Sequence, residues 1–331
     1  MAHRPLRIAL LGGVPASLGG GGLELQMERT RDALSRAGHE VFHVFEHREP
    51  RPFDILHAFG SEREVWHPLE YWRRNPAPLV VSPIMVVAPG RAERSLWVSH
   101  HLPLPAFAPR ARVATLRRAA AVIALTEHEK QLVYRLAGKR VHRVEVIGNG
   151  VEPVGPADPA ALAGLGLPER YVVLLGSVSP RKRQAEAIAA LAGGDVVPVV
   201  IGGVEGGESE RAAWERAVGA AGARWLGEIH DAALVRAVLA GSSGLVHFSG
   251  AEGQSLAVLE ALSAGAPVIV SPLPSHEELR ARYPEHVVIV GDIAGLSGAV
   301  AQIADRRPGP AAVPTWDDIA TTLVALYDSL L

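Results

Sequence analysis

Short apolar or β-branched runs alternate with helical stretches along the whole chain of 331 residues. These runs predict strands at 7–11, 40–45, 54–59, 79–81, 121–125 and 144–147 in the first half, and at 171–175, 196–201, 223–226, 244–248, 267–270 and 286–290 in the second. Helices are expected between most of them, among others at 23–37, 128–136, 183–192, 208–221, 232–240 and 255–264. Such alternation is typical of parallel sheets covered by helices. Because it occurs twice, the pattern predicts an α/β protein with two Rossmann-like domains.

Glycine and proline mark where these domains end. A segment rich in both residues at 148–159 has the composition of a turn and linker, and a second such segment lies at 306–310. Beyond it, Thr315 has the features of a helix N-cap that leads into a final helix up to 330. We therefore expect an N-terminal domain over 1–150, a second domain over 151–313 and a terminal helix over 314–331.

The composition excludes several classes of protein. The chain has no cysteine, which rules out disulfides, cysteine-ligated metals and thiol catalysis. It has no apolar run of about 18 residues to span a membrane, and the start of the chain has no apolar signal region. We therefore expect a cytoplasmic protein.

Charge is distributed unevenly between the halves. Residues 1–150 hold 21 Lys and Arg against 14 Asp and Glu, whereas residues 151–331 hold 12 against 21. A basic first half could contact an anionic acceptor or the inner face of a membrane, or it could be an ordinary solvated surface. No nucleic-acid partner is expected.

A glycine run at 19–22 follows the first predicted strand and opens the first helix. Glycines at that place let a phosphate approach backbone N–H groups. The spacing is not G-x-G-x-x-G, yet Glu46 ends the second strand, where a dinucleotide fold keeps its ribose acid. A nicotinamide-dependent oxidoreductase therefore stays open, as does a plain flexible turn.

Three cations, Arg181, Lys182 and Arg183, follow the first strand of the second half and precede a helix. The helix dipole disfavours cations at that end. A bound polyanion would explain their placement, and a solvated basic turn is the alternative.

Two carboxylates, Glu252 and Glu260, stand eight positions apart around the start of another helix. The first lies in a glycine-containing loop and the second has mostly apolar neighbours, so a carboxylate there needs partners. The pair would surround a pocket at the carboxyl edge of a strand, where α/β proteins bind ligands. An acid and base flanking a scissile bond, or a surface Glu260, are the alternatives.

Metal and hydrolase chemistry have little support. His100 and His101 lie in a proline-rich loop, and without cysteine a metal site there would need further ligands. The chain has no D-x-D motif and no G-x-S-x-G elbow. No metal and no resident cofactor are expected.

Taken together, these motifs resemble retaining GT-B-fold glycosyltransferases of family four. The segment 252–270 is similar to the family's E-G-x-x-L-x-x-x-E-A-x-x-x-G-x-P-V-I pattern. Five further segments follow the family's order: 19–22, 146–151, 176–182, 226–229 and 315–327. The resemblance covers nearly the whole chain. It implies two Rossmann-like domains facing across a cleft, with the last helix packed back on the first domain.

The resemblance also implies a function and residue roles. The family transfers a sugar from a nucleotide-diphosphate sugar, such as a UDP- or GDP-sugar, to a hydroxyl acceptor without a metal. Glu252 would contact the sugar hydroxyls and Glu260 the ribose, while Lys182 and Arg181 would neutralise the departing diphosphate. The remaining donor-binding positions are Gly20, Gly21, Ile229, Gly253, Gln254, Ser255 and Leu256.

The chain departs from the family at several positions. Ser177 stands where the family usually has Arg, and Pro274-Ser275 replaces a Gly-Gly pair. Ser82-Pro83-Ile84 occupies the place of a frequent acceptor-side His, so His100 or His101 is assigned that role. A catalytically silent nucleotide-sugar-binding protein of the same fold is a further alternative.

Overall fold

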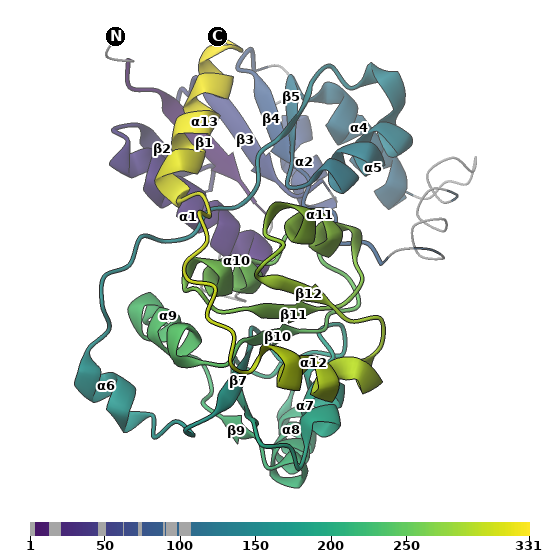
Figure 1. Ribbon diagram of the computed structural model, residues 1–331. Coiled ribbons are helices and arrows are strands. Elements are labelled where there is room, and N and C mark those ends of the chain that lie inside the picture. Colours follow the sequence, from purple (N-terminus) through teal and green to yellow (C-terminus); the bar gives the residue numbers. More distant parts are fainter. Residues whose placement is uncertain are drawn as a thin grey trace. The chain divides into compact units, whose positions relative to one another are not determined.

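The chain folds into two compact units, each built on a parallel sheet (Figure 1). The computed structural model describes residues 4–12, 21–45, 51–61, 63–71, 75–88, 90, 98 and 107–331. The first unit combines Met1–Gly150 with Pro314–Leu331, and the second is Val151–Val313.

The first unit has a six-stranded sheet of order β2-β1-β3-β4-β5-β6. Its strands are β1 (Arg7–Leu11), β2 (Glu40–His43), β3 (Ile55–Phe59), β4 (Leu79–Ser82), β5 (Ala121–Ala124) and β6 (Val144–Val146). Its helices are α1 (Gly22–Arg36), α2 (Arg63–Tyr71), α4 (Phe107–Arg118), α5 (Glu127–Ala137) and α13 (Trp316–Asp328). The order reverses between β1 and β3, so the crevice of this sheet lies beyond their carboxyl ends.

The second unit has a six-stranded sheet of order β12-β11-β10-β7-β8-β9. Its strands are β7 (Tyr171–Leu175), β8 (Val197–Ile201), β9 (Arg224–Trp225), β10 (Leu245–His247), β11 (Val268–Val270) and β12 (Val287–Ile289). Its helices are α6 (Pro159–Gly164), α7 (Gln184–Leu191), α8 (Glu208–Ala221), α9 (Ala232–Gly241), α10 (Leu256–Ser263), α11 (Pro274–Arg282) and α12 (Leu296–Ile303). Here the order reverses between β7 and β10.

The predicted fold class is confirmed, and each of the twelve predicted strands is present. The boundaries differ by up to two residues at an end. Most predicted runs include apolar flanking residues that lie just outside the paired strand. Gly38 has φ +91° and follows the last residues of α1, as a left-handed glycine after a helix should. Helices α2, α4, α6, α11 and α12 were not among the predicted ranges, and α6 begins at the end of the segment predicted as a linker.

None of the described helices is long and apolar enough to cross a membrane. The longest, α1, has 15 residues, whereas a span needs about 20.

A buried polar chain ties the last helix to the first sheet. His57 lies in the interior of β3. Its Nδ1 is 2.7 Å from the Tyr327 hydroxyl of α13, and its Nε2 is 2.9 Å from the Ser82 hydroxyl of β4. Burial lowers the pKa of His57 to about 3, so the ring is neutral and one nitrogen donates while the other accepts. Helix α13 also packs on α1. The contact anchors a segment that joins this unit from the far end of the chain.

Replacing Tyr327 with Phe should destabilise the first unit. The change removes one partner of a buried imidazole and leaves that nitrogen unpaired, which costs about 1–3 kcal/mol. Denaturant unfolding followed by probes in each unit would measure the loss. The matched control is Tyr283→Phe in the second unit, whose hydroxyl makes a weaker 3.3 Å bond to the Ala312 carbonyl. Equal, small losses in both variants would contradict the anchoring role.

Candidate functional site

The candidate site lies where the strand order of the second sheet reverses. Strands β7 and β10 are neighbours there. From β7 the chain continues to β8 toward one edge of the sheet, and from β10 it continues to β11 toward the other edge. A crevice forms beyond the carboxyl ends of two such strands, and open α/β sheets bind ligands in it. The loops that border it are 176–183 after β7 and 248–255 after β10.

The loop after β7 is clamped from the inside by Gln184, the first residue of α7. Its side-chain nitrogen donates to the carbonyl of Ser177 at 2.7 Å, and its oxygen accepts from the backbone N–H of Ser179 at 3.2 Å. Gln184 is 4% exposed. Arg183 precedes it with φ +55°, a left-handed conformation uncommon for a residue with a side chain. The turn that carries the three cations is therefore fixed rather than a loose solvated segment.

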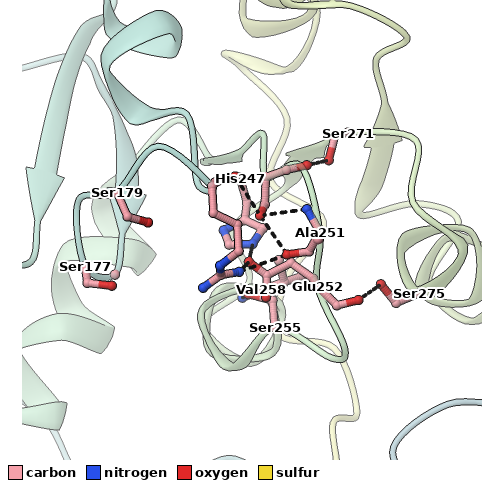
Figure 2. Close-up of polar contacts among 12 residues, drawn as sticks. Ser177, Ser179, His247, Ala251, Glu252, Ser255, Val258, Ser271 and Ser275 are labelled. Atoms are coloured by element: carbon pink, nitrogen blue, oxygen red, sulfur yellow. Dashed lines mark hydrogen bonds and ion pairs between the residues drawn. The ribbon is translucent and has the colours of Figure 1, made fainter. Parts of the chain in front are cut away.

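The loop after β10 is held by serine hydroxyls, which Figure 2 shows around Glu252. Ser271 donates to the carbonyl of Ser249 at 2.6 Å, and Ser249 donates to that of Ala251 at 3.0 Å. Ser275 reaches the carbonyl of Glu252 at 3.4 Å. These bonds satisfy buried carbonyl groups in a segment without regular structure.

Arg181 joins the two loops through both its backbone and its side chain. Its carbonyl accepts from the N–H of Gly250 at 2.8 Å. Its guanidinium donates to the carbonyl of Ala251 at 2.8 Å and to Oε1 of Glu252 at 2.9 Å. The structure therefore brings together the cation and the carboxylate that the sequence places 71 positions apart.

The Glu252 carboxylate is a buried anion among three cationic or polar groups. Its side chain is 11% exposed, and Nε2 of His247 lies 3.3 Å from the same Oε1 that Arg181 binds. Burial raises the pKa of Glu252, but the contacts with His247, Arg181 and Lys182 lower it more, to about 2. The group is therefore ionised at neutral pH and can accept hydrogen bonds only.

Lys182 folds back over the start of its own loop. A side chain on Gly176, whose φ is +116°, would collide with the Lys182 ammonium. Burial lowers the pKa of Lys182, the carboxylates of Glu252 and Glu205 raise it, and the net shift is downward. Ser177, at the family's Arg position, instead donates to Glu205 at 2.6 Å. The ammonium thus lies between two carboxylates in a largely desolvated place.

Helix α10 starts beside this cluster. Ser255 is its N-cap and accepts from the N–H of Val258 at 3.4 Å, while Leu256 is its first residue. The first N–H groups of a helix have no intrahelical acceptor and favour an anion. Gly253 is buried and Gln254 half-buried in the preceding loop.

Two other predicted donor-binding residues, Glu260 and Ile229, also lie in the second unit. Glu260 is half-buried in the second turn of α10, whose other faces are mostly buried. Ile229 is half-buried after β9 and packs against the core.

In the first unit, Gly21 is the N-cap of α1, and its N–H donates to the carboxylate of Glu24 at 3.1 Å. Gly20, Glu46, His100 and His101 lie outside the described residues. The acceptor-side assignment therefore stays a prediction.

Sequence reasoning missed His247. It ends β10, immediately before the Glu252 loop, and it is 5% exposed. The available signal was a single polar residue inside the apolar run 244–248. Among the described residues, no group of three or more His, Asp or Glu side chains could hold a metal ion.

A family model matches part of the chain. The family model for glycosyl transferases group 1 matches residues 169–306, which include both loops of the site. No curated protein sequence matches the chain.

Solved structures share the fold over nearly the whole chain. A sucrose-phosphate synthase from Thermosynechococcus elongatus is 18% identical with a TM-score of 0.75, covering 98% of this chain and 99% of the other. A UDP-forming α,α-trehalose-phosphate synthase from Burkholderia xenovorans, in complex with glucose-6-phosphate, is 12% identical with a TM-score of 0.67, covering 98% and 96%. The E. coli trehalose-6-phosphate protein bound with UDP-2-fluoro glucose is 11% identical with a TM-score of 0.62, covering 98% and 99%. At such identities the likeness establishes the GT-B architecture, and with the family match it supports a sugar-transfer function.

Glu252→Gln should destabilise the second unit in a pH-dependent way. Because the folded-state pKa of Glu252, about 2, lies below its usual 4.5, the carboxylate stabilises the fold above pH 4.5, and this stabilisation is lost as the pH falls toward 2. We expect the variant to lose about 1–3 kcal/mol at pH 7, less than a fully buried pair would, because Arg181 is partly exposed. The difference in unfolding free energy between the variant and the wild-type protein should shrink as the pH falls from about 5 to about 3.

Urea unfolding of the second unit at several pH values would measure this gap. Glu215→Gln is the control, because Glu215 pairs with Arg211 at 3.1 Å on the surface, with 53% of its side chain exposed. That change should cost less than about 0.5 kcal/mol at every pH. A gap for Glu252→Gln that stays constant with pH would argue against an ionised, buried Glu252.

Proposed function

We propose that this protein is a retaining, metal-independent glycosyltransferase without a resident cofactor. It moves a hexose-type sugar from a nucleotide-diphosphate sugar to a hydroxyl of a glycan, a lipid-linked acceptor or a small molecule. The observation that carries the proposal is the convergence of Arg181, Lys182 and Glu252 at the switch point of the second sheet.

The cations and the start of α10 suit a diphosphate. Lys182 and Arg181 supply positive charge, and the N–H groups at Ser255 and Leu256 supply hydrogen-bond donors and the positive end of the helix dipole. Charge that builds on a leaving diphosphate is stabilised most by donors that are already in place and shielded from water. Gln184 holds the backbone of the loop that carries these cations before a ligand arrives.

The ionised Glu252 suits the sugar. A carboxylate that only accepts hydrogen bonds fits the hydroxyl groups of a hexose. The contacts of Arg181 and His247 fall on Oε1, and we assign Oε2 to the sugar. We assign Glu260 to the ribose hydroxyls of the nucleotide.

Transfer then proceeds on one face of the sugar. The bond between the anomeric carbon and the diphosphate oxygen breaks, and the acceptor oxygen bonds to the same face of that carbon. The acceptor proton passes to the departing diphosphate oxygen, so the products are a glycosylated acceptor and a nucleoside diphosphate. The protein contributes position and charge rather than a nucleophile. Among the structural relatives, the E. coli protein binds UDP-2-fluoro glucose, which favours a nucleotide-sugar donor.

A nucleoside diphosphate should stabilise the protein against heat. A ligand at 100 times its dissociation constant adds about 2.7 kcal/mol to the stability of the state it binds. A thermal-shift screen of UDP, GDP, ADP and dTDP, followed by their sugars, would identify the donor. Lys182→Ala should abolish most of this protection, whereas Lys139→Ala, a change in the first unit, should not. Protection by NAD alone would favour the oxidoreductase, and binding without donor turnover would favour the silent binder.

Gly176→Ala should weaken diphosphate binding by displacing Lys182. The matched control is Gly193→Ala, because Gly193 also has a positive φ, +74°, but no atom lies within 4 Å of an added Cβ. Both changes strain the backbone by about 1 kcal/mol. Calorimetric titration with the nucleoside diphosphate should show at least tenfold weaker binding for Gly176→Ala alone, about 1.4 kcal/mol. Equal affinities in the two variants would contradict a phosphate role for Lys182.

A further inference from the structure

His247 is a buried imidazole at the end of a strand whose neighbouring residues are apolar. Its neighbours Leu245 and Val246 are apolar and buried, as β10 lies in the middle of the sheet. Its Nε2 is buried without a hydrogen-bond partner and lies 3.3 Å from Oε1 of Glu252. An unpaired buried polar group costs free energy that an apolar side chain would avoid. The imidazole therefore needs a reason other than packing.

A second imidazole fixes the first. His276 of α11 is fully buried, and its ring meets the ring of His247 edge to face, with centroids 5.7 Å apart and planes at 76°. Nδ1 of His276 donates to the carbonyl of Ser271 at 2.8 Å, which sets the orientation of that ring. Because the Ser271 hydroxyl in turn holds the carbonyl of Ser249, the same segment supports both His276 and the loop of Glu252.

We propose that His247 is the positioning residue for Glu252 and keeps its carboxylate in place while a donor is bound. This inference rests on the proposed function. In the ligand-free protein, Arg181 and His247 both approach Oε1. When a diphosphate arrives, it competes for the guanidinium of Arg181, whose side chain is 42% exposed. His247, 4% exposed in its side chain and anchored in a central strand, stays where it is.

In this arrangement Arg181 is the mobile partner of Glu252 and His247 is the rigid one. Arg181 has a long side chain on a loop, so it can turn toward the phosphates. A group on a strand, supported by packing, holds a functional side chain more accurately than one on a loop. With His247 fixed by His276, Oε1 keeps a neighbour and Oε2 keeps its direction toward the sugar.

The test compares His247→Leu, His247→Gln and Val246→Ala. Leu fills the apolar site but cannot contact the carboxylate, whereas Gln places an N–H near the former Nε2. Val246 precedes His247 on β10 and packs in the core on the opposite face of the sheet, so Val246→Ala reports general damage to the strand. The three readouts are kcat and KM for donor cleavage, the Kd of the free nucleoside diphosphate, and the titration of the Glu252 carboxyl by NMR in the ligand-free protein.

We expect His247→Leu to lower kcat about 10- to 100-fold, as displacement of a reacting group does. The Kd of the nucleoside diphosphate should stay within about twofold, because Arg181 and Lys182, which are assigned to the phosphates, are unchanged in this variant. The Glu252 titration should move to higher pH, because the loss of His247 removes one of the contacts that lower the pKa of this buried carboxyl. His247→Gln should recover most of kcat, and Val246→Ala should lose stability without losing kcat.

The proposal is overturned if His247→Leu keeps kcat, if Val246→Ala lowers kcat as much, or if the Glu252 titration does not move. Failure of the proposed function looks different. A wild-type protein that neither binds nor cleaves any nucleotide sugar would refute sugar transfer, and the Glu252 titration in the three variants would still support or overturn the contact itself.

Discussion

The buried carboxylate of Glu252 is the charge on which the arrangement of the second unit depends. An ionised carboxylate in such a place is tolerated only with partners, and these come from two loops and a strand: Arg181 and Lys182 after β7, and His247 at the end of β10. Each partner has to be held in turn. The clamp of Gln184, the serine hydroxyls around Ser249 and the ring of His276 serve this one requirement.

Backbone contacts beyond the strands provide the rigid base on which those side chains stand. The N–H of Gly176 donates to the carbonyl of Ile201, and that of Gly202 donates to the carbonyl of Gly227. A side chain at Gly202 would collide with the carbonyl of Gly176, so the chain can approach this closely only through glycine. The carboxyl ends of β7, β8 and the segment after β9 are thereby tied into one edge. A ligand at this edge meets backbone that needs little further ordering, which lowers the entropic cost of binding.

The sequence predicts the strands well because parallel strands buried on both faces are continuous apolar runs with clear borders. It also places Arg181, Lys182 and Glu252 at strand ends, and the reversal of strand order then brings them together. The roles of His247, His276 and Gln184 could not be predicted in the same way. Each works through a contact between segments distant in the chain or through a backbone conformation, as at Arg183, and a sequence pattern reports neither.

The first unit also contains a buried histidine, His57, but its ring nitrogens have different partners from those of His247. His57 has hydroxyl partners on both nitrogens, from Tyr327 and Ser82, and is fully satisfied inside the core. His247 has its Nε2 buried beside a carboxylate without a hydrogen bond. A satisfied imidazole stabilises a fold, whereas an unsatisfied one lowers stability and persists where the surrounding structure offsets the cost. The contrast between these two buried histidines supports a structural role for His57 and the proposed positioning role for His247 at the switch point of the second sheet.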